Sequence, residues 1–281
     1  MKIQQKLAIA FFRTKIKLLG IISNRMAAEE TLRIFLTPMM KSKAKKKEPF
    51  SNGERLLFTF NGLSIKGFRC NHPGVHKVLL LHGFSSNCRN FDKYVQPLIE
   101  KKYEVLAFDA PAHGASEGRT TNAVEYSEMI IKINELYGPV NGYIAHSFGG
   151  IALALAMEKI VHNPDTKIVL IAPATETSTA VDGAFEMLGL QNERLRKTVD
   201  QLVLERTSKE TSWFSIRRAM NNIRASVLWF HDEDDDITPL EDALKVKTDN
   251  HSNIQFVITK GLGHRKIYRD EGVVNASVKF L

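Results

Sequence analysis

The stretch that most constrains this chain is Gly142–Gly150, where a short apolar run leads into a serine and two glycines. An apolar helical pattern begins at Ile151, so the stretch predicts a strand that turns sharply into a helix with Ser147 at the corner. Small residues, Ala145 and Gly149, lie two positions before and after the serine, where a tight turn leaves no room for larger side chains. Such a corner exposes a hydroxyl beside the first N–H groups of the helix. The stretch therefore indicates a nucleophile, although alone it is equally typical of an incidental serine.

Short apolar runs alternate with helical patterns along most of the chain after residue 54. Asn61-Gly62 separates two period-two runs, 55–60 and 63–70, and predicts a β-hairpin. Further strands are predicted at 77–81, 105–108, 142–146, 167–172, 225–230 and 254–258, with helices between them. This rhythm predicts an α/β fold with a mostly parallel central sheet and helices on both faces.

Two segments depart from this rhythm. Residues 174–223 are longer than a usual crossover and contain two or three helical stretches, so we expect a short helical cap over the carboxyl ends of the strands. Residues 1–50 read as a basic helical extension and linker, with helices at 1–23 and 27–36 and a lysine run at 41–47. The predicted organisation is therefore this extension followed by an α/β domain over residues 51–281.

The first predicted helix is amphipathic. Its apolar face carries Ala8, Phe12, Ile16 and Leu19, and its basic face carries Lys2, Lys6, Arg13 and Lys17. We favour packing of the apolar face on the folded domain or on a second subunit. Peripheral association of residues 1–47 with an anionic membrane surface is the alternative.

Composition narrows the partners and the compartment. The formal net charge of +8 is concentrated before residue 50, and no basic patch interleaved with aromatic residues follows it, which argues against a nucleic-acid partner. Two cysteines are too few for a disulfide framework, so we expect both reduced in a cytoplasmic protein. Arg13, Lys15 and Lys17 interrupt the apolar residues of the first helix, so no membrane span is predicted.

Three predicted loops at the carboxyl ends of strands carry complementary groups. Ser147 is followed in the chain by the acidic loop 231–236 and then by His264. A serine hydroxyl needs an imidazole to accept its proton and a carboxylate to orient that imidazole. Five acidic residues compete for the last role: Asp232, Glu233, Asp234, Asp235 and Asp236. A cation site in this loop is less favoured than a solvated turn, so no metal or cofactor is expected.

These loops resemble those of the α/β-hydrolase superfamily, in particular small serine esterases and monoglyceride- or lysophospholipid-lipase-like enzymes with a short helical cap. The resemblance covers residues 54–281. The matching motifs are the nucleophile turn 145–149, with Ala145 for the commoner Gly; the oxyanion loop 82–84; the turn 109–116, with Ala112 for Gly; the acid loop 231–239, with Asp232 for Gly; and Gly263-His264.

The resemblance implies a role for each matching position. Ser147 would be the nucleophile, His264 the general base and then acid, and Asp235 the orienting carboxylate. The backbone N–H groups of Phe84 and Phe148 would form the oxyanion hole. The resemblance also places His82, Gly83 and His146 around the substrate pocket; His82 and His113 are more typical of turn residues that bond to backbone.

The predicted activity is hydrolysis of carboxylic esters, with a small-molecule substrate that carries an apolar acyl group. Thioester, carbon–carbon or peptide hydrolysis by the same three groups remains an alternative. A catalytically idle binding or scaffold protein with this fold is a further alternative.

Overall fold

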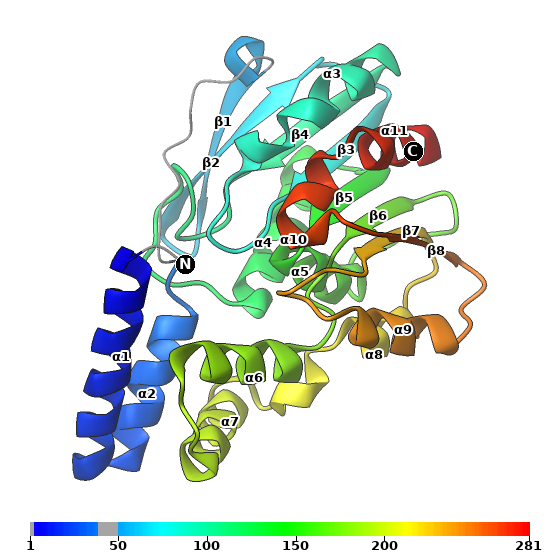
Figure 1. Ribbon diagram of the computed structural model, residues 1–281. Helices are drawn as coiled ribbons and strands as arrows, with labels where there is room; N and C mark the ends of the chain where they lie inside the picture. Colours follow the sequence, from blue (N-terminus) through cyan, green and yellow to red (C-terminus); the bar gives the residue numbers. More distant parts are fainter. Residues whose placement is uncertain (1–2, 39–49) are drawn as a thin grey trace. The chain divides into compact units, whose positions relative to one another are not determined.

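The computed structural model describes residues 3–38 and 50–281, which divide into two compact units (Figure 1). The sheet unit comprises Pro38–Thr175 and Ile216–Leu281, and the helical unit comprises the described residues up to Thr37 together with Glu176–Ser215. The lysine run predicted as a linker, 41–47, lies outside the described residues.

Within the described residues, eight strands form one sheet in the order β1-β2-β4-β3-β5-β6-β7-β8. Their bounds are β1 Glu54–Phe60, β2 Leu63–Cys70, β3 His76–Leu81, β4 Tyr103–Phe108, β5 Gly142–His146, β6 Lys167–Ile171, β7 Ser226–Asp232 and β8 Ile254–Thr259. β1 and β2 form the predicted hairpin, and β2 pairs antiparallel with β4. The other neighbours are parallel, which confirms the predicted mostly parallel sheet.

Helices cover both faces of this sheet, as the sequence predicted. The helices of the unit are α3 Asp92–Glu100, α4 Ala123–Tyr137, α5 Phe148–Met157, α8 Ile216–Met220, α9 Leu240–Thr248, α10 Gly263–Lys266 and α11 Glu271–Phe280. On one face, α3 and α11 pack with alternate strand residues in one apolar cluster that includes Val78, Ile144 and Phe230. On the other face, α4 contacts β4 and β5 through Tyr137 and Asn134. Asn122 caps α4 by accepting a hydrogen bond from the Glu125 N–H.

The helical unit joins the N-terminal helices to the insertion. α1 Ile3–Ile22 and α2 Asn24–Phe35 pack with α6 Thr177–Leu188 and α7 Glu193–Thr207 around a wholly apolar cluster. The Arg13 Nε–H donates to the Leu188 carbonyl at 2.7 Å, which ties α1 to the end of α6. The predicted inner face of α1 is therefore used within this unit. No helix among the described residues combines the length and apolar composition of a membrane span.

Several predicted boundaries differ from the structure. Of the helices in the predicted 174–223 insertion, α6 and α7 belong to the helical unit, whereas α8 belongs to the sheet unit. The structure extends β7 to Asp232, beyond the predicted end at Phe230, because the last residues of β7 pair with β8. Pro239 is the N-cap residue of α9.

Candidate active site

Ser147 occupies a strained corner between β5 and α5. Its φ of +54° and ψ of −120° lie outside the regions that non-glycine residues normally adopt, at a cost of about 1–3 kcal/mol. The surrounding backbone holds this conformation: the Ser147 N–H donates to the Ile171 carbonyl at 3.1 Å, and the Ser147 carbonyl accepts from Gly150 at 2.9 Å. The sharp turn predicted from the sequence is therefore present, with the serine at its apex.

Glycines allow three chain segments to meet at this corner. A Cβ atom on Gly149 would lie 2.7 Å from the Leu81 carbonyl oxygen, so only glycine lets the first turn of α5 approach the end of β3. A Cβ atom on Gly83 would lie 3.0 Å from the Ser147 Cβ. The loop after β3 is thus packed directly against the serine.

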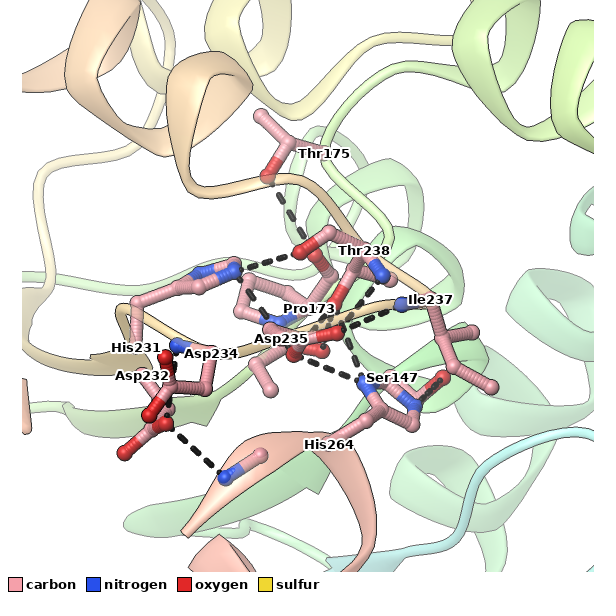
Figure 2. Close-up of polar contacts among 12 residues, drawn as sticks. Ser147, Pro173, Thr175, His231, Asp232, Asp234, Asp235, Ile237, Thr238 and His264 are labelled. Atoms are coloured by element: carbon pink, nitrogen blue, oxygen red, sulfur yellow. Dashed lines mark hydrogen bonds and ion pairs between the residues drawn. The ribbon is translucent and has the colours of Figure 1, made fainter. Parts of the chain in front are cut away.

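The structure brings Ser147, His264 and Asp235 together in one chain of contacts (Figure 2). The Ser147 Oγ lies 3.0 Å from the His264 Nε2, and the His264 Nδ1 lies 2.9 Å from the Asp235 Oδ2. Ser147 and His264 are both buried, and the Asp235 side chain has no exposed surface. The hydroxyl thus has a proton acceptor within reach, and the opposite edge of the imidazole faces a carboxylate.

Thr238 is a member of this network that the sequence interpretation missed. Its hydroxyl donates to the Asp235 Oδ2 at 2.9 Å and lies 3.0 Å from the His264 Nδ1. The Asp235 Oδ1 accepts from the N–H groups of Ile237 at 2.9 Å and Thr238 at 2.8 Å. Burial alone would raise the pKa of Asp235, but the hydrogen bond from His264 and those from the two N–H groups outweigh it and lower the pKa. An Asp followed three residues later by Thr is the available sequence signal, because such pairs form turns through side-chain bonds.

Asp232 organises the loop that carries the histidine. From the end of β7, its Oδ1 accepts from the Gly263 N–H at 2.8 Å and from the Asp234 N–H at 3.0 Å. Its Oδ2 accepts from the Thr259 hydroxyl at 2.7 Å and from the Leu262 N–H at 3.2 Å. Burial raises the pKa of this carboxyl and the four donors lower it, with the net effect a pKa below its usual value. Sequence alone had placed Asp232 in a loop among five competing acids.

The other acids of this loop have separate contacts. The Asp234 Oδ2 accepts from the Gly261 N–H at 2.9 Å, and Glu233 forms an exposed ion pair with Lys260 at 3.0 Å. α9 has no side-chain N-cap hydrogen bond, so neither Asp234 nor Asp236 caps it. Within residues 3–38 and 50–281, no group of three His, Cys, Asp or Glu residues is placed to hold a metal ion.

Buried histidines surround the Ser147–His264 pair. The His146 Nε2 donates to the His264 carbonyl at 3.1 Å, and its ring stacks on Tyr268 with centroids 4.3 Å apart. Burial lowers the pKa of His146 to about 3 and that of His82 to about 4, so both are neutral. The His82 Nε2 accepts from the Ala110 N–H, and its Nδ1 donates to the Gly83 carbonyl.

His113 and His231 also bond to backbone. The His113 Nε2 accepts from the Ser85 N–H at 3.0 Å, and its Nδ1 donates to the Pro111 carbonyl at 2.9 Å. The His231 Nε2 donates to the Thr238 carbonyl at 2.7 Å, which braces the acid loop from behind. The expectation that His82 and His113 bond to backbone is confirmed.

Phe84 and Phe148 lie beside the serine on adjoining segments. Phe148 is the first residue of α5, where a backbone N–H has no acceptor within the helix. Phe84 directly follows Gly83, and the two phenylalanine rings meet edge to face with centroids 5.4 Å apart. Both rings are partly exposed, so they form an apolar surface next to the corner.

Comparison with known proteins assigns the chain to a family. The family model described as "Alpha/beta hydrolase family" matches residues 78–276, and the chain belongs to this family. The solved structure of the Pyrococcus furiosus esterase Pf2001 is similar with a TM-score of 0.63 and 18% identity, covering 88% of this chain and 97% of that one. At such identity the likeness establishes the fold alone.

Two curated relatives are similar in sequence. The lysophosphatidylserine lipase ABHD12 of Danio rerio is 28% identical over 236 residues, which are 77% of this chain and 60% of the relative. The uncharacterized hydrolase YugF of Bacillus subtilis is 33% identical over 107 residues, 36% of this chain and 39% of the relative. The chain therefore matches less than two thirds of the length of either relative.

Proposed function

We propose that this chain is a serine hydrolase that cleaves carboxylic esters through an acyl-enzyme intermediate. The observation that carries the proposal is the continuous contact from the Ser147 Oγ through both ring nitrogens of His264 to the Asp235 carboxylate. Membership of the alpha/beta hydrolase family and the esterase and lipase names among similar proteins support it.

In the first step, the Ser147 oxygen attacks the ester carbonyl while the His264 Nε2 takes the hydroxyl proton. His264 then returns that proton to the leaving alkoxide, and the acyl group remains on the serine as an ester. Water attacks this acyl-enzyme and gives a proton to His264. His264 passes that proton to the departing Ser147 oxygen, which releases the carboxylic acid and restores the free serine. Asp235 keeps the proton of the neutral imidazole on Nδ1 and stabilises the imidazolium. The lowered pKa of Asp235 suits this role, because the carboxylate stays ionised.

The backbone N–H groups of Phe148 and Phe84 are the proposed donors to the carbonyl oxygen as it becomes negative. The close packing of Gly83 on Ser147 supports this proposal, because it brings the loop after β3 beside the attacking oxygen. His82 has both ring nitrogens bonded to backbone and no exposed surface, so we assign it to shaping this loop instead of binding substrate.

The proposed substrates carry an apolar acyl group. The edge-to-face pair of Phe84 and Phe148 offers an apolar wall next to the serine and no compensating charge. The relative from Danio rerio is named as a lysophosphatidylserine lipase, and a lipid substrate also carries an apolar acyl chain. Thioesters, peptides and substrates with a cleavable carbon–carbon bond are the competing substrates that the same three side chains could cleave.

Hydrolysis of p-nitrophenyl esters of graded acyl length, with thioester and peptide substrates in parallel, tests the proposal. Ser147→Ala should lower turnover on the order of 10⁴-fold or more, because the nucleophile is removed while the fold remains. Ser226→Ala, on the N-terminal end of β7, is the matched control and should keep full activity. A fluorophosphonate probe should label Ser147 in mass spectrometry. A labelled serine elsewhere, or an active Ser147→Ala protein, would refute the assignment.

A further inference from the structure

α1 carries apolar side chains on two opposite faces. Ile9 and Ile16 are buried in the core of the helical unit. Leu7, Phe11 and Leu18 are 65%, 65% and 58% exposed, and the next turns add Ile21 and Ile22 at 82% and 74%. We call Leu7, Phe11, Leu18, Ile21 and Ile22 the outer stripe of α1.

The spacing of these residues places them along one side of the helix, with the exposed Thr14 between Phe11 and Leu18. Leu7, Phe11, Leu18 and Ile22 follow one another at intervals of four, seven and four, so they lie along one side of the helix. Single exposed apolar residues such as Leu57 are ordinary on protein surfaces, whereas a row of large ones on one side of a helix marks an interaction site.

Positive charge borders the outer stripe. At about 100° per residue, Lys15 and Lys17 fall on opposite sides of the line through Phe11 and Leu18. The Lys15 Nζ forms an ion pair with Glu30 of α2 at 2.8 Å, so Lys17 carries the uncompensated charge at this border. No acidic residue precedes Glu29, whereas six basic residues do: Lys2, Lys6, Arg13, Lys15, Lys17 and Arg25. In the sequence, five further lysines follow between residues 41 and 47.

We propose that the outer stripe of α1 docks on an anionic lipid surface, with Lys17 at the level of the headgroups. An apolar stripe that enters the acyl boundary, flanked by lysines whose stems reach back to phosphate, is the pattern of an interfacial helix. Each lysine near an anionic surface adds about 1 kcal/mol of attraction.

The charge distribution favours a lipid surface over a second copy of the chain. Two outer stripes packed together would bring Lys17 of both copies close, and α1 has no carboxylate to neutralise it. The apolar face predicted from the sequence, with Phe12 and Ile16, packs inside the helical unit. The proposed membrane contact is therefore made by the opposite face, which carries the outer stripe.

The test uses co-sedimentation of the full chain with vesicles of equal parts phosphatidylcholine and phosphatidylglycerol, and with phosphatidylcholine alone. We expect binding to the anionic vesicles that weakens with salt. Phe11→Gln/Leu18→Gln should reduce this binding about a hundredfold, since each buried apolar side chain contributes about tenfold. Lys17→Gln should reduce it about fivefold.

The matched control, Leu57→Gln/Val161→Gln, removes two exposed apolar side chains of the sheet unit and should bind as the unaltered chain does. Activity on a short soluble ester separates this proposal from the proposed function: the stripe variants should retain whatever activity the unaltered chain has. Absence of binding to anionic vesicles, or unchanged binding of the stripe variant, overturns the proposal. So does a dimer in sedimentation that the stripe variant dissociates.

A second measurement does not depend on the stability of the double variant. Tryptophan replaces Phe11 in one protein and Leu57 in another, and brominated lipid quenches only a tryptophan that enters the acyl boundary. We expect quenching with Phe11→Trp above the background of Trp213 and Trp229, and none with Leu57→Trp. Equal quenching in the two proteins would contradict docking through α1.

Discussion

The sheet unit buries a polar network in addition to its apolar core, whereas the buried cluster of the helical unit is apolar. At the strand ends of the sheet unit, Ser147, His264, Asp235 and Thr238 are polar, buried and joined by hydrogen bonds near 3 Å. The core cluster of the helical unit contains apolar side chains, and pairs such as Arg25–Glu205 lie on its surface. In the polar network the positions of individual atoms determine activity, whereas in the apolar cluster the filled volume determines stability.

The sharpest test of this contrast compares two neighbouring carboxylates. Asp235→Asn should lower turnover on the order of 10⁴-fold, because an amide facing the His264 Nδ1 favours the wrong tautomer. Asp234→Asn, which alters only a bond to the Gly261 N–H, should stay within about tenfold of the unaltered protein. Turnover of a p-nitrophenyl ester measures both. A crippled Asp234→Asn beside a nearly normal Asp235→Asn would move the orienting role by one residue.

In the helical unit, loss of volume should affect stability alone. Leu188→Ala removes a side chain that is 1% exposed and should cost about 2–5 kcal/mol of unfolding free energy, while turnover of a short soluble ester stays constant. Urea unfolding followed by circular dichroism gives the free energy. Leu204→Ala, 45% exposed in α7, is the control and should cost less than about 1 kcal/mol. A large loss of short-ester turnover in folded Leu188→Ala would break the contrast.

Asp232→Asn tests the polar interior away from the reacting atoms. We expect a loss of about 2–3 kcal/mol in the stability of the sheet unit, because an amide group cannot accept all four hydrogen bonds of the carboxylate. Turnover should fall as well, since the loop that holds His264 loosens. Glu233→Gln, in an exposed ion pair, serves as the control and should leave both quantities unchanged. Urea unfolding and ester turnover measure the two effects, and a fully stable, fully active Asp232→Asn would contradict the role given to this carboxylate.

Acid should act on the sheet unit through its histidines. The folded pKa values of His82, about 4, and His146, about 3, lie below the 6.5 of a free histidine. The unfolded chain therefore binds more protons between these values, and stability falls as the pH drops below about 6.5, by up to about 1.4 kcal/mol per pH unit for each histidine. All nine histidines lie outside the helical unit. Urea unfolding of Trp213→Phe, in which Trp229 reports the sheet unit, should show this slope; a flat profile would contradict it.

The smallest effect is expected for a surface ion pair of the helical unit. Arg25→Gln removes the contact of Arg25 with Glu205, whose side chains are both exposed. Water and salt screen such pairs, so the urea midpoint should not shift measurably. A midpoint shift as large as that of Leu188→Ala would show that charge geometry matters in this unit too.

Local patterns made much of the sheet unit predictable. A few residues each encode the nucleophile turn 145–149 and the hairpin at Asn61-Gly62. The order of Ser147, the acid loop and His264 can likewise be read along the chain. The parallel sheet then follows, because parallel strands end at a common edge. The role of Asp232 in holding the His264 loop was not predictable. It requires β7 to extend to Asp232, two residues beyond the end of the apolar pattern at Phe230.

The partners of the N-terminal helices could not be read from the sequence. The face with Phe12 and Ile16 predicts burial but does not specify against what, and α6 and α7 lie far along the chain. The outer stripe is not predictable from the sequence for a related reason. α1 has apolar residues on two sides, and the sequence does not indicate which side packs inside the folded chain.

This pairing of distant segments has a consequence during synthesis. α1 and α2 leave the ribosome early. Their partners in the helical unit begin only at Glu176, so the whole stretch after Thr37 must be synthesised first. At about 5–20 residues per second, that interval lasts roughly 7–30 s. During this interval the inner face of α1 lacks its neighbours α6 and α7, and the outer stripe is exposed as it is in the folded chain, so the nascent chain displays apolar residues on both sides of α1 while the first six strands are being made. A chaperone or a nearby bilayer that holds this helix would keep it from aggregating until α6 and α7 arrive.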